Sequence, residues 1–435
     1  MPLSAGRFAL WRQPQSGRIY TLPPVGTYLY TSGHNDVSQT LTGKTHQVFG
    51  AGSDHYIYGM AVRQLQNNIY IYGTRWDEIN KTWETSADYL TEIGVGDNIN
   101  TNALFSEAAL YDGGDLPLDM TIRGLVNFDS NTADGKPWLP LFLDPTRTTG
   151  VGFTLGNAVY TPGIGVGTAG EPKDMAPVGS AYNGDPGYIF AGRGSNFRLY
   201  TVGPIGPNSV TEHFVADFGS GDQRISVDAA FPGWGVGSAF SYNGYRQRRH
   251  INAITFYGDG TWDAGNNIIT TDVREGNITT VNHGASTYVV AYGRKSSDAN
   301  LPLITQLHRV DFAQNSAPQG TVLNQLNWTG EDQINERESQ VVRGFQPNTA
   351  YLFWINTQNS SLLEMRKLVV LNDVLTQDTS ASETFDFSGI SAGSTLRQID
   401  FEPLQTQGRK YFTGVYKDAY GQINDVVIQL VGSQY

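Results

Sequence analysis

The sequence contains no cysteine among its 435 residues. Disulfide bonds, thiolate metal sites and cysteine nucleophiles are therefore excluded. Charged side chains are also scarce, at 16 % of the chain against about 25 % in a typical globular protein. Glycine, with 50 residues, and tyrosine, with 23, are abundant instead. A polar, weakly charged, glycine-rich sequence is typical of β-proteins with many turns, because turns need Gly, Asn or Asp.

Positive charge is in short supply. The 29 Lys and Arg residues are outnumbered by 41 Asp and Glu residues, which gives a formal net charge of −12 and a pI near 5.0. No basic stripe stands out in the sequence. Because binding to a phosphate backbone depends on clustered Lys and Arg, we expect no stable or sequence-specific binding of nucleic acid.

Long apolar runs are missing as well. No stretch approaches the ~20 apolar residues that a membrane helix needs. The start of the chain, Met1–Phe8, lacks the basic segment followed by an apolar core that marks a secretory signal. We therefore expect neither membrane insertion nor a cleaved signal peptide.

Helical periodicity is nearly absent, whereas strand signals occur throughout. The two best helical candidates, Ala87–Ile93 and Ala103–Tyr111, are both short. Elsewhere, β-branched and aromatic runs are bounded by Gly, Asn, Asp and Pro, which is the pattern of strands and turns. The sequence predicts an all-β protein.

A two-strand unit recurs in the C-terminal third of the chain. Each copy begins with an aromatic residue, continues through a polar turn and ends in a second β-rich run. The clearest copies are Tyr288–Tyr292 with Leu301–Phe312, Tyr351–Ile355 with Leu362–Leu371, and Tyr411–Tyr416 with Ile423–Leu430. Their first residues, 288, 351 and 411, lie 63 and 60 residues apart. A fixed period of this size indicates one supersecondary unit repeated around a ring or along a stack.

The repeat can be followed back through the chain, with starts near residues 56, 120, 188 and 239. Seven units in residues 1–435 predict a single β-propeller domain with seven blades, each a mostly antiparallel four-stranded sheet. A closed ring leaves no exposed sheet edge. A tandem of β-sandwiches, or a ring of six or eight blades, remains an alternative.

Two segments fall outside the period. Residues 144–186 are rich in Gly and Pro and are interpreted as a long loop excursion. Residues 8–22 contain spare strands, Phe8–Trp11 and Ile19–Leu22, one of which is expected to complete the last blade and close the ring.

Two turns end in Thr-Trp, at Glu78–Trp83 and Asp259–Trp262. The first resembles the Asp-box of sialidase-type propellers, a serine followed by Asp-x-Gly-x-Thr-Trp. It departs from that pattern with Arg or Trp for the serine, Glu78 for the acid and Asn80 for the glycine, and the second turn is two residues too short. In that family the acid caps backbone amides and the Trp packs below the turn. The resemblance implies a propeller turn, not a catalytic site.

Several other features are weak candidates for binding. The only basic cluster in the sequence consists of Arg246, Arg248, Arg249 and His250. Converging arginines can hold a carboxylate through paired hydrogen bonds. A charged hairpin or a subunit contact is nevertheless the preferred interpretation of this cluster. The weak candidates for a Ca²⁺ site are three carboxylates in a Gly-rich turn, Asp112, Asp115 and Asp119. A solvated loop is the preferred interpretation of this turn.

Tryptophans either stack on sugars or pack between blades, and packing is the preferred interpretation. The contact candidates are Trp76, Trp83 and Trp262. No catalytic residue is predicted. No cofactor is predicted either, because Ser38–Thr45 has Ser38 where a P-loop needs its first glycine.

In overall character, with no cysteine, low charge, high Gly, Asn, Thr and Tyr content and a predicted ring, the chain resembles tail proteins of bacteriophages, in particular the propeller-containing nozzle proteins. This resemblance implies a non-enzymatic structural protein of the virion, which forms a homo-oligomer and binds other tail proteins. The first alternative is a propeller that binds a host glycan without cleaving it. The second is a carbohydrate-active enzyme, sialidase-like or glycosidase-like.

Overall fold

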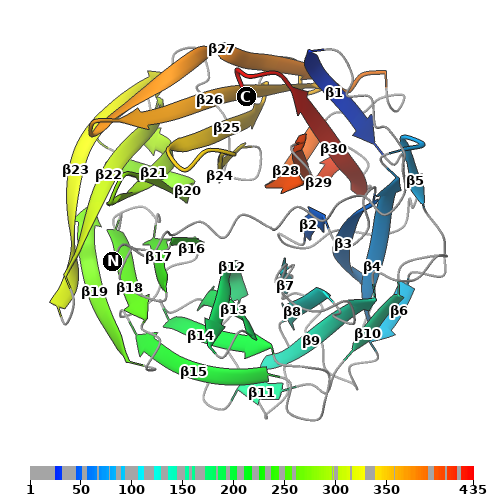
Figure 1. The fold of residues 1–435 in the computed structure, drawn as a ribbon, viewed down its shortest axis with the longest axis horizontal. Coiled ribbons are helices and arrows are strands. Elements are labelled where there is room, and N and C mark those ends of the chain that lie inside the picture. The colour runs from blue at the N-terminus through cyan, green and yellow to red at the C-terminus, as the bar shows by residue number, and fades with distance from the viewer. Residues whose placement is uncertain are drawn as a thin grey trace, which may run out of the picture.

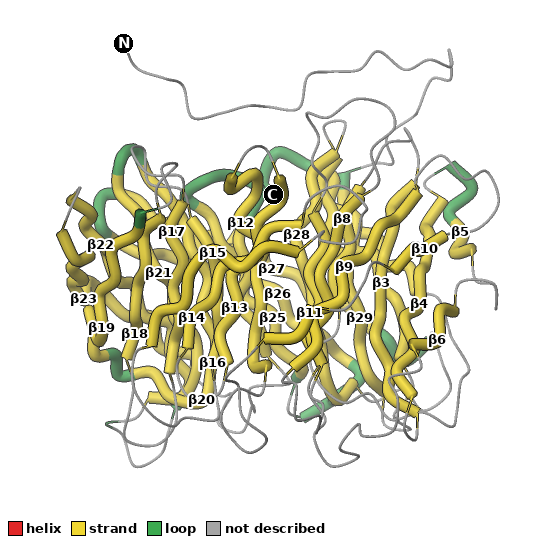
Figure 2. Tube along the Cα trace, turned by 90° about the horizontal axis from the view of Figure 1, so that it is seen from below, coloured by secondary structure: helices red, strands yellow, loops and turns green. Residues whose placement is uncertain are grey.

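The computed structural model describes residues 25–31, 46–50, 56–65, 68–77, 79–84, 90–93, 106–111, 122–128, 136–144, 152–155, 159–161, 172–182, 185–192, 196–202, 210–217, 225–230, 237–243, 250–256, 261–295, 297, 302–313, 316–328, 339–356, 358–389, 396–406, 409–418 and 423–435. All of its regular elements are strands (Figure 2). None of these residues belongs to a helix long and apolar enough to span a membrane. The chain is therefore all-β over the described residues, as predicted.

The two predicted helical segments are corrected. The structure has strand β6 (Leu90–Ile93) within the first and strand β7 (Ser106–Tyr111) within the second. Both are too short for a helical pattern to be decisive, and pairing with a neighbouring strand determines their conformation.

The described strands form seven antiparallel sheets. The first comprises β2 (His46–Gly50), β3 (Tyr56–Leu65), β4 (Asn68–Asp77) and β5 (Thr82–Glu84), with β6 beside β4. The second comprises β7, β8 (Ile122–Phe128), β9 (Lys136–Asp144) and β10 (Gly152–Leu155), with β11 (Val159–Thr161) beside β9. The third comprises β12 (Pro172–Tyr182), β13 (Asp185–Gly192), β14 (Asn196–Val202) and β15 (Val210–Asp217).

The fourth sheet comprises β16 (Ile225–Ala230), β17 (Gly237–Asn243), β18 (His250–Phe256) and β19 (Trp262–Thr270). The fifth comprises β20 (Val273–His283), β21 (Ser286–Lys295), β22 (Leu303–Ala313) and β23 (Ser316–Trp328). The sixth comprises β24 (Ser339–Arg343), β25 (Thr349–Ile355), β26 (Leu362–Leu371) and β27 (Val374–Asp386). The seventh, called the closing sheet below, comprises β28 (Leu396–Thr406), β29 (Arg409–Asp418), β30 (Ile423–Val431) and β1 (Gly26–Thr31).

The first strands of the seven sheets lie next to one another in a cycle. β2 contacts β7, and the contacts continue through β12, β16, β20, β24 and β28, which in turn contacts β2. Figure 1 shows these strands facing the middle of the ring, with the last strands of the sheets at the rim. The three repeat copies found in the sequence form the two central strands of the fifth, sixth and closing sheets.

The closing sheet combines both ends of the described chain. β1 pairs antiparallel with β30, in a register that runs from Gly26 opposite Val431 to Thr31 opposite Val426 (Figure 1). The segment predicted to close the ring, residues 8–22, lies outside the described residues. The stretch 144–186, interpreted from the sequence as a loop excursion, contains β10, β11 and the whole of β12.

Residues 432–435 continue from the closing sheet to the sixth sheet. Lys410 Nζ donates to the main-chain oxygen of Tyr435 over 2.5 Å, and Lys367 Nζ donates to that of Gln434. The Tyr435 hydroxyl donates to Glu383 on β27, and the Tyr435 side chain is buried. These contacts fasten the end of the closing sheet to its neighbour.

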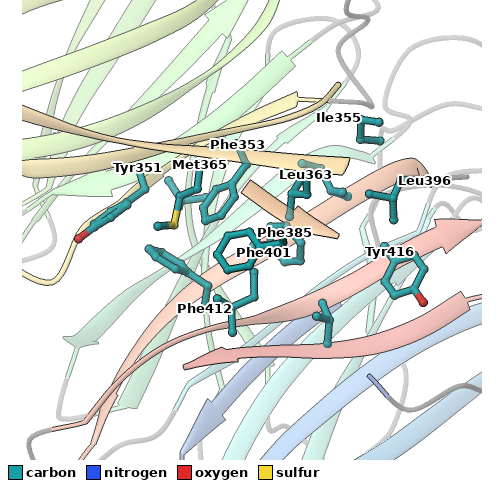
Figure 3. Packing of buried hydrophobic residues seen from close by; sticks show 14 of the residues in the cluster. Tyr351, Phe353, Ile355, Leu363, Met365, Phe385, Leu396, Phe401, Phe412 and Tyr416 are labelled. Carbon is teal, nitrogen blue, oxygen red and sulfur yellow. The ribbon is translucent and has the colours of Figure 1, made fainter. Parts of the chain in front are cut away.

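The best-described hydrophobic core lies between the sixth sheet and the closing sheet. Phe353 and Phe401 pack edge to face with ring centroids 5.1 Å apart, and Phe412 packs on Phe353 at 4.9 Å (Figure 3). Tyr351 packs on Phe412 at 4.8 Å. Aromatic residues that begin the repeated strands thus pack between sheets, which explains their recurrence in the sequence.

Side-chain amides join neighbouring first strands. Gln340 on β24 accepts a hydrogen bond from Phe401 N at 2.8 Å and donates to Phe401 O at 3.1 Å. Asn277 on β20 accepts from Val341 N at 3.0 Å and donates to Ser339 O. Each amide therefore pairs with the backbone of the next sheet as a strand would, which satisfies backbone groups that the sheet itself leaves unpaired.

Candidate functional site

The turn predicted to resemble an Asp-box is present, but a different acid caps it. Asp77 accepts hydrogen bonds from Ile79 N at 2.8 Å and from Asn80 N at 3.0 Å. Lys81 follows in a left-handed conformation, with φ of 56°. The capping acid is thus one residue earlier than Glu78, the residue that the pattern indicated. The role of the turn is structural, since the carboxylate is occupied by backbone amides.

The tryptophan candidates differ in exposure. Trp76 is buried and packs on Tyr30 of the closing sheet, with ring centroids 4.7 Å apart. Trp83 lies on β5, opposite Trp76 in the strand register. Trp262, at the start of β19, has 39 % of its surface exposed. Among these candidates, Trp76 is a packing residue, whereas Trp262 is accessible to a ligand.

Most of the other sequence candidates lie outside the described residues. They are Arg246, Arg248 and Arg249 of the basic cluster and Asp112, Asp115 and Asp119 of the acidic loop. His250, at the start of β18, has its Nδ1 atom 3.2 Å from Thr270 Oγ1. Within the part of the chain that the structure describes, no group of three or more His, Asp or Glu side chains is arranged to hold a metal ion.

A cluster of charged groups and a phenol lies between the fifth and sixth sheets. The Tyr288 hydroxyl donates to Asp373 Oδ1 over 2.7 Å, and Arg309 Nη1 donates to Asp373 Oδ2 over 2.8 Å. Arg309 Nε lies 3.2 Å from Asp311 Oδ1. We call Tyr288, Arg309, Asp311 and Asp373 the Tyr288–Asp373 cluster. It brings a proton donor, a cation and two carboxylates together.

Strand register and turn geometry position these side chains. Tyr288 and Arg309 are directly opposite each other on β21 and β22. Asp311 lies two residues beyond Arg309 on β22 and so faces the same side of the sheet. Asp373 lies in the two-residue turn between β26 and β27, where Asn372 and Asp373 have φ of 50° and 64°. Asn and Asp tolerate this left-handed conformation better than other non-glycine residues.

The cluster reaches solvent through its charged members. The side chains of Arg309, Asp311 and Asp373 are 32 %, 57 % and 42 % exposed, respectively. The Tyr288 side chain is buried, and burial, followed by the hydrogen bond to Asp373, raises its pKa. The charges of Asp311 and then of Asp373 raise the pKa of Arg309. The phenol is therefore protonated at neutral pH, beside a carboxylate and a permanent cation.

Strands near the cluster also carry exposed aliphatic side chains. Leu371 and Val374 flank the turn and are 52 % and 46 % exposed, and Val322 on β23 is 45 % exposed. The Asn324 amide pairs with N and O of Leu375 at 2.9 and 3.0 Å, which holds β23 beside the start of β27. Val322 is paired with His308 in the strand register, so it lies on the face of the fifth sheet opposite to Tyr288 and Arg309.

A second charged cluster is less accessible. Arg366 Nη2 lies 3.0 Å from Glu364 Oε2, and the Arg366 guanidinium lies over the Trp354 ring at 5.0 Å. Thr384 Oγ1 donates to the same carboxylate oxygen at 2.7 Å. Glu364 and Arg366 are only 10 % and 22 % exposed. This cluster stabilises the sixth sheet, and the Tyr288–Asp373 cluster is the better candidate site.

The sequence did not identify the Tyr288–Asp373 cluster. Tyr288 was noted only as the first residue of a repeat, and Asp373 lies 64 residues beyond Arg309. The Asn372–Asp373 pair between two β-rich runs is a turn signal. It contains no information about the arginine and the tyrosine that the turn meets.

No protein-family model and no curated protein matches the sequence. The solved structures that resemble the fold share little sequence with it. The S. cerevisiae core factor has a TM-score of 0.52 at 8 % identity, and the match covers 96 % of this chain and 63 % of that chain, less than two thirds of its length. An ulvan lyase has a TM-score of 0.48 at 12 % identity, over 92 % of this chain and 96 % of that one. Trypanosoma rangeli sialidase has a TM-score of 0.40 at 10 % identity, over 91 % of this chain and 56 % of that one.

At identities of 8–12 %, these likenesses concern the fold alone. The all-β prediction is confirmed by the strands of the described residues. Nothing in the comparisons indicates a phage tail protein. The predicted role as a virion structural protein, and with it the prediction that the chain is not an enzyme, is wrong: the neighbours include polysaccharide lyases and sialidases. The misleading features were low charge and high Gly, Asn and Tyr content. They reflect the many turns of a large β-protein, whatever its function.

Proposed function

We propose that the chain is a carbohydrate-active enzyme that cleaves glycosidic bonds at the Tyr288–Asp373 cluster. The observation that carries this proposal is that one phenol and one guanidinium contact the same solvent-accessible carboxylate, with a second carboxylate on the other side of the guanidinium. Glycoside hydrolysis generally needs a proton donor for the leaving oxygen and a second group that assists water. The cluster contains both.

Each member has a distinct role in the proposed reaction. Tyr288 donates its proton to the glycosidic oxygen as the bond to the anomeric carbon breaks. Asp373 orients the phenol, and Arg309 stabilises the negative charge that the proton transfer leaves behind. Asp311, the most exposed member, accepts a proton from the water that adds to the anomeric carbon. Solvent then returns that proton to Tyr288.

The architecture proposed for this enzyme is a seven-bladed β-propeller closed by β1. Two observations support it: the first strands of the seven described sheets contact each other in a cycle, and β1 adds to the sheet that contains the last strand, β30. In this arrangement the Tyr288–Asp373 cluster lies at one end of the ring, between the fifth and sixth blades.

The proposal is tested by incubating the purified protein with a panel of neutral, cationic and acidic polysaccharides. Reducing ends and unsaturated products are measured separately, which distinguishes hydrolysis from elimination. We expect reducing ends from at least one polysaccharide, and a loss of about 100-fold or more in kcat/KM for Tyr288→Phe, which removes only the hydroxyl. Asp373→Asn is expected to lower the rate similarly.

The matched control is Asp386→Asn. Asp386 is an exposed carboxylate whose side chain accepts a hydrogen bond from Ser388 N, near the opposite end of β27. Its replacement should leave the rate unchanged. Failure to cleave any polysaccharide of the panel, or full activity in Tyr288→Phe with an unchanged melting temperature, would exclude the proposed site.

A further inference from the structure

We infer that the glycan cleaved at the Tyr288–Asp373 cluster carries no acidic groups. This inference rests on the proposed function and specifies its substrate class. It depends on the net charge of the cluster and on the uncharged residues beside Asp373.

The cluster has an excess of negative charge. One guanidinium faces two carboxylates, so the formal charge of Arg309, Asp311 and Asp373 together is −1. Arg309 directs Nε toward Asp311 and Nη1 toward Asp373, so its charge is already compensated. An acidic sugar bound here would meet uncompensated carboxylates, and like charges in close contact are strongly unfavourable.

The whole chain has the same sign of charge. With 41 acidic and 29 basic residues, its net charge is −12. A field of this sign slows the approach of polyanions and favours neutral or cationic chains. Both the local and the overall charge therefore act against acidic polysaccharides.

The turn that carries Asp373 offers no counter-charge of its own. Leu371 and Val374, the residues on either side of the Asn372–Asp373 turn, are 52 % and 46 % exposed. Aliphatic side chains at these positions give an acidic substituent neither a hydrogen bond nor a cation.

The test compares one polymer in two charge states. The best neutral substrate from the panel is oxidised at its primary hydroxyls to carboxylates, which changes charge while keeping backbone and linkage. At low salt we expect the oxidised polymer to be cleaved at least about tenfold more slowly than its neutral parent, because it meets like charge. Added NaCl should narrow the difference, since salt screens exposed charges.

A charge variant on the rim provides an independent measurement. Val374→Lys adds a cation at the residue that follows Asp373 without altering any member of the cluster, and it should raise cleavage of the oxidised polymer selectively. Val25→Lys is the matched control: Val25 is 73 % exposed and precedes β1 in the closing sheet. Equal rates on the two polymers, or activity confined to acidic glycans, would overturn this inference and leave the proposed function intact. An absence of cleavage on every polymer would overturn both.

Discussion

His308 is a buried residue whose chemistry is set by its surroundings. It lies on β22, is fully buried, and neither ring nitrogen has a hydrogen-bond partner among the described residues. Burial lowers its pKa to about 3. The neutral ring packs in the core, one residue before Arg309 on β22. Its lowered pKa is therefore caused by packing and is unrelated to the candidate site.

A pH dependence of stability follows from His308. Its pKa is lower in the folded than in the unfolded chain, so this contribution to stability is complete above pH 6.5 and is lost as the pH falls from 6.5 toward 3. At roughly 1.4 kcal/mol per pKa unit, up to about 5 kcal/mol is involved. In urea unfolding, His308→Leu should show a smaller loss of unfolding free energy over this range than the unchanged protein. Parallel curves for the two proteins would contradict the assignment.

At the scale of elements, the paired amide is the device that joins one sheet to the next. Gln340 joins β24 to β28, and Asn277 joins β20 to β24. Asn324 makes the same type of pair between β23 and β27, at the rim. Each bridge exchanges two hydrogen bonds with one stretch of backbone, and so fixes the register between sheets as well as their separation.

Removing one bridge should destabilise the protein without altering any sheet. Gln340→Met keeps the side-chain length but leaves the N–H and C=O of Phe401 buried without their partner. We expect a loss of roughly 2–6 kcal/mol in the free energy of unfolding, because each of the two orphaned buried groups costs about 1–3 kcal/mol. Gln319→Met, at an exposed position on β23, is the control and should change stability by less than about 0.5 kcal/mol. Equal effects at both positions would show that the bridge contributes nothing.

The strands could be predicted from the sequence, whereas the contacts between sheets could not. The recurring aromatic starts at 288, 351 and 411 correctly identified β21, β25 and β29, because alternation and turn residues are local signals. The bridge between Gln340 and Phe401 and the contact between Arg309 and Asp373 join residues more than 60 positions apart. They depend on how two sheets face each other, and no local pattern in the sequence specifies that arrangement. The turn at 77–83 shows that even a local motif can be misassigned by one residue, because Asp77 caps it and not Glu78.

At the scale of the whole molecule, the pairing of β1 with β30 carries the proposed closure. Tyr28 lies directly opposite Gln429 in this pair. Because the chain has no cysteine, a double variant Tyr28→Cys with Gln429→Cys introduces the only two thiols. Opposed residues on antiparallel strands have the Cα separation that a disulfide requires.

We expect this double variant to form an intramolecular disulfide on mild oxidation, detected by mass spectrometry of linked peptides, and to melt at a higher temperature than its reduced form. The control pairs Tyr28→Cys with Gln319→Cys on β23, in a different sheet, and should stay reduced or form dimers. A double variant at 28 and 429 that cross-links only between molecules would count against closure by β1.

The pairing of the first described strand with the last also determines when the molecule can finish folding. During synthesis at about 5–20 residues per second, β1 emerges tens of seconds before its partner β30 exists. Throughout that time the hydrogen-bonding edge of β1 is open, and unpaired strand edges are sites of aggregation. The contact that joins them has almost the largest sequence separation possible in this chain, and such contacts form slowly. The closing sheet is therefore expected to be the last part of the molecule to assemble, and the step at which chaperones matter most.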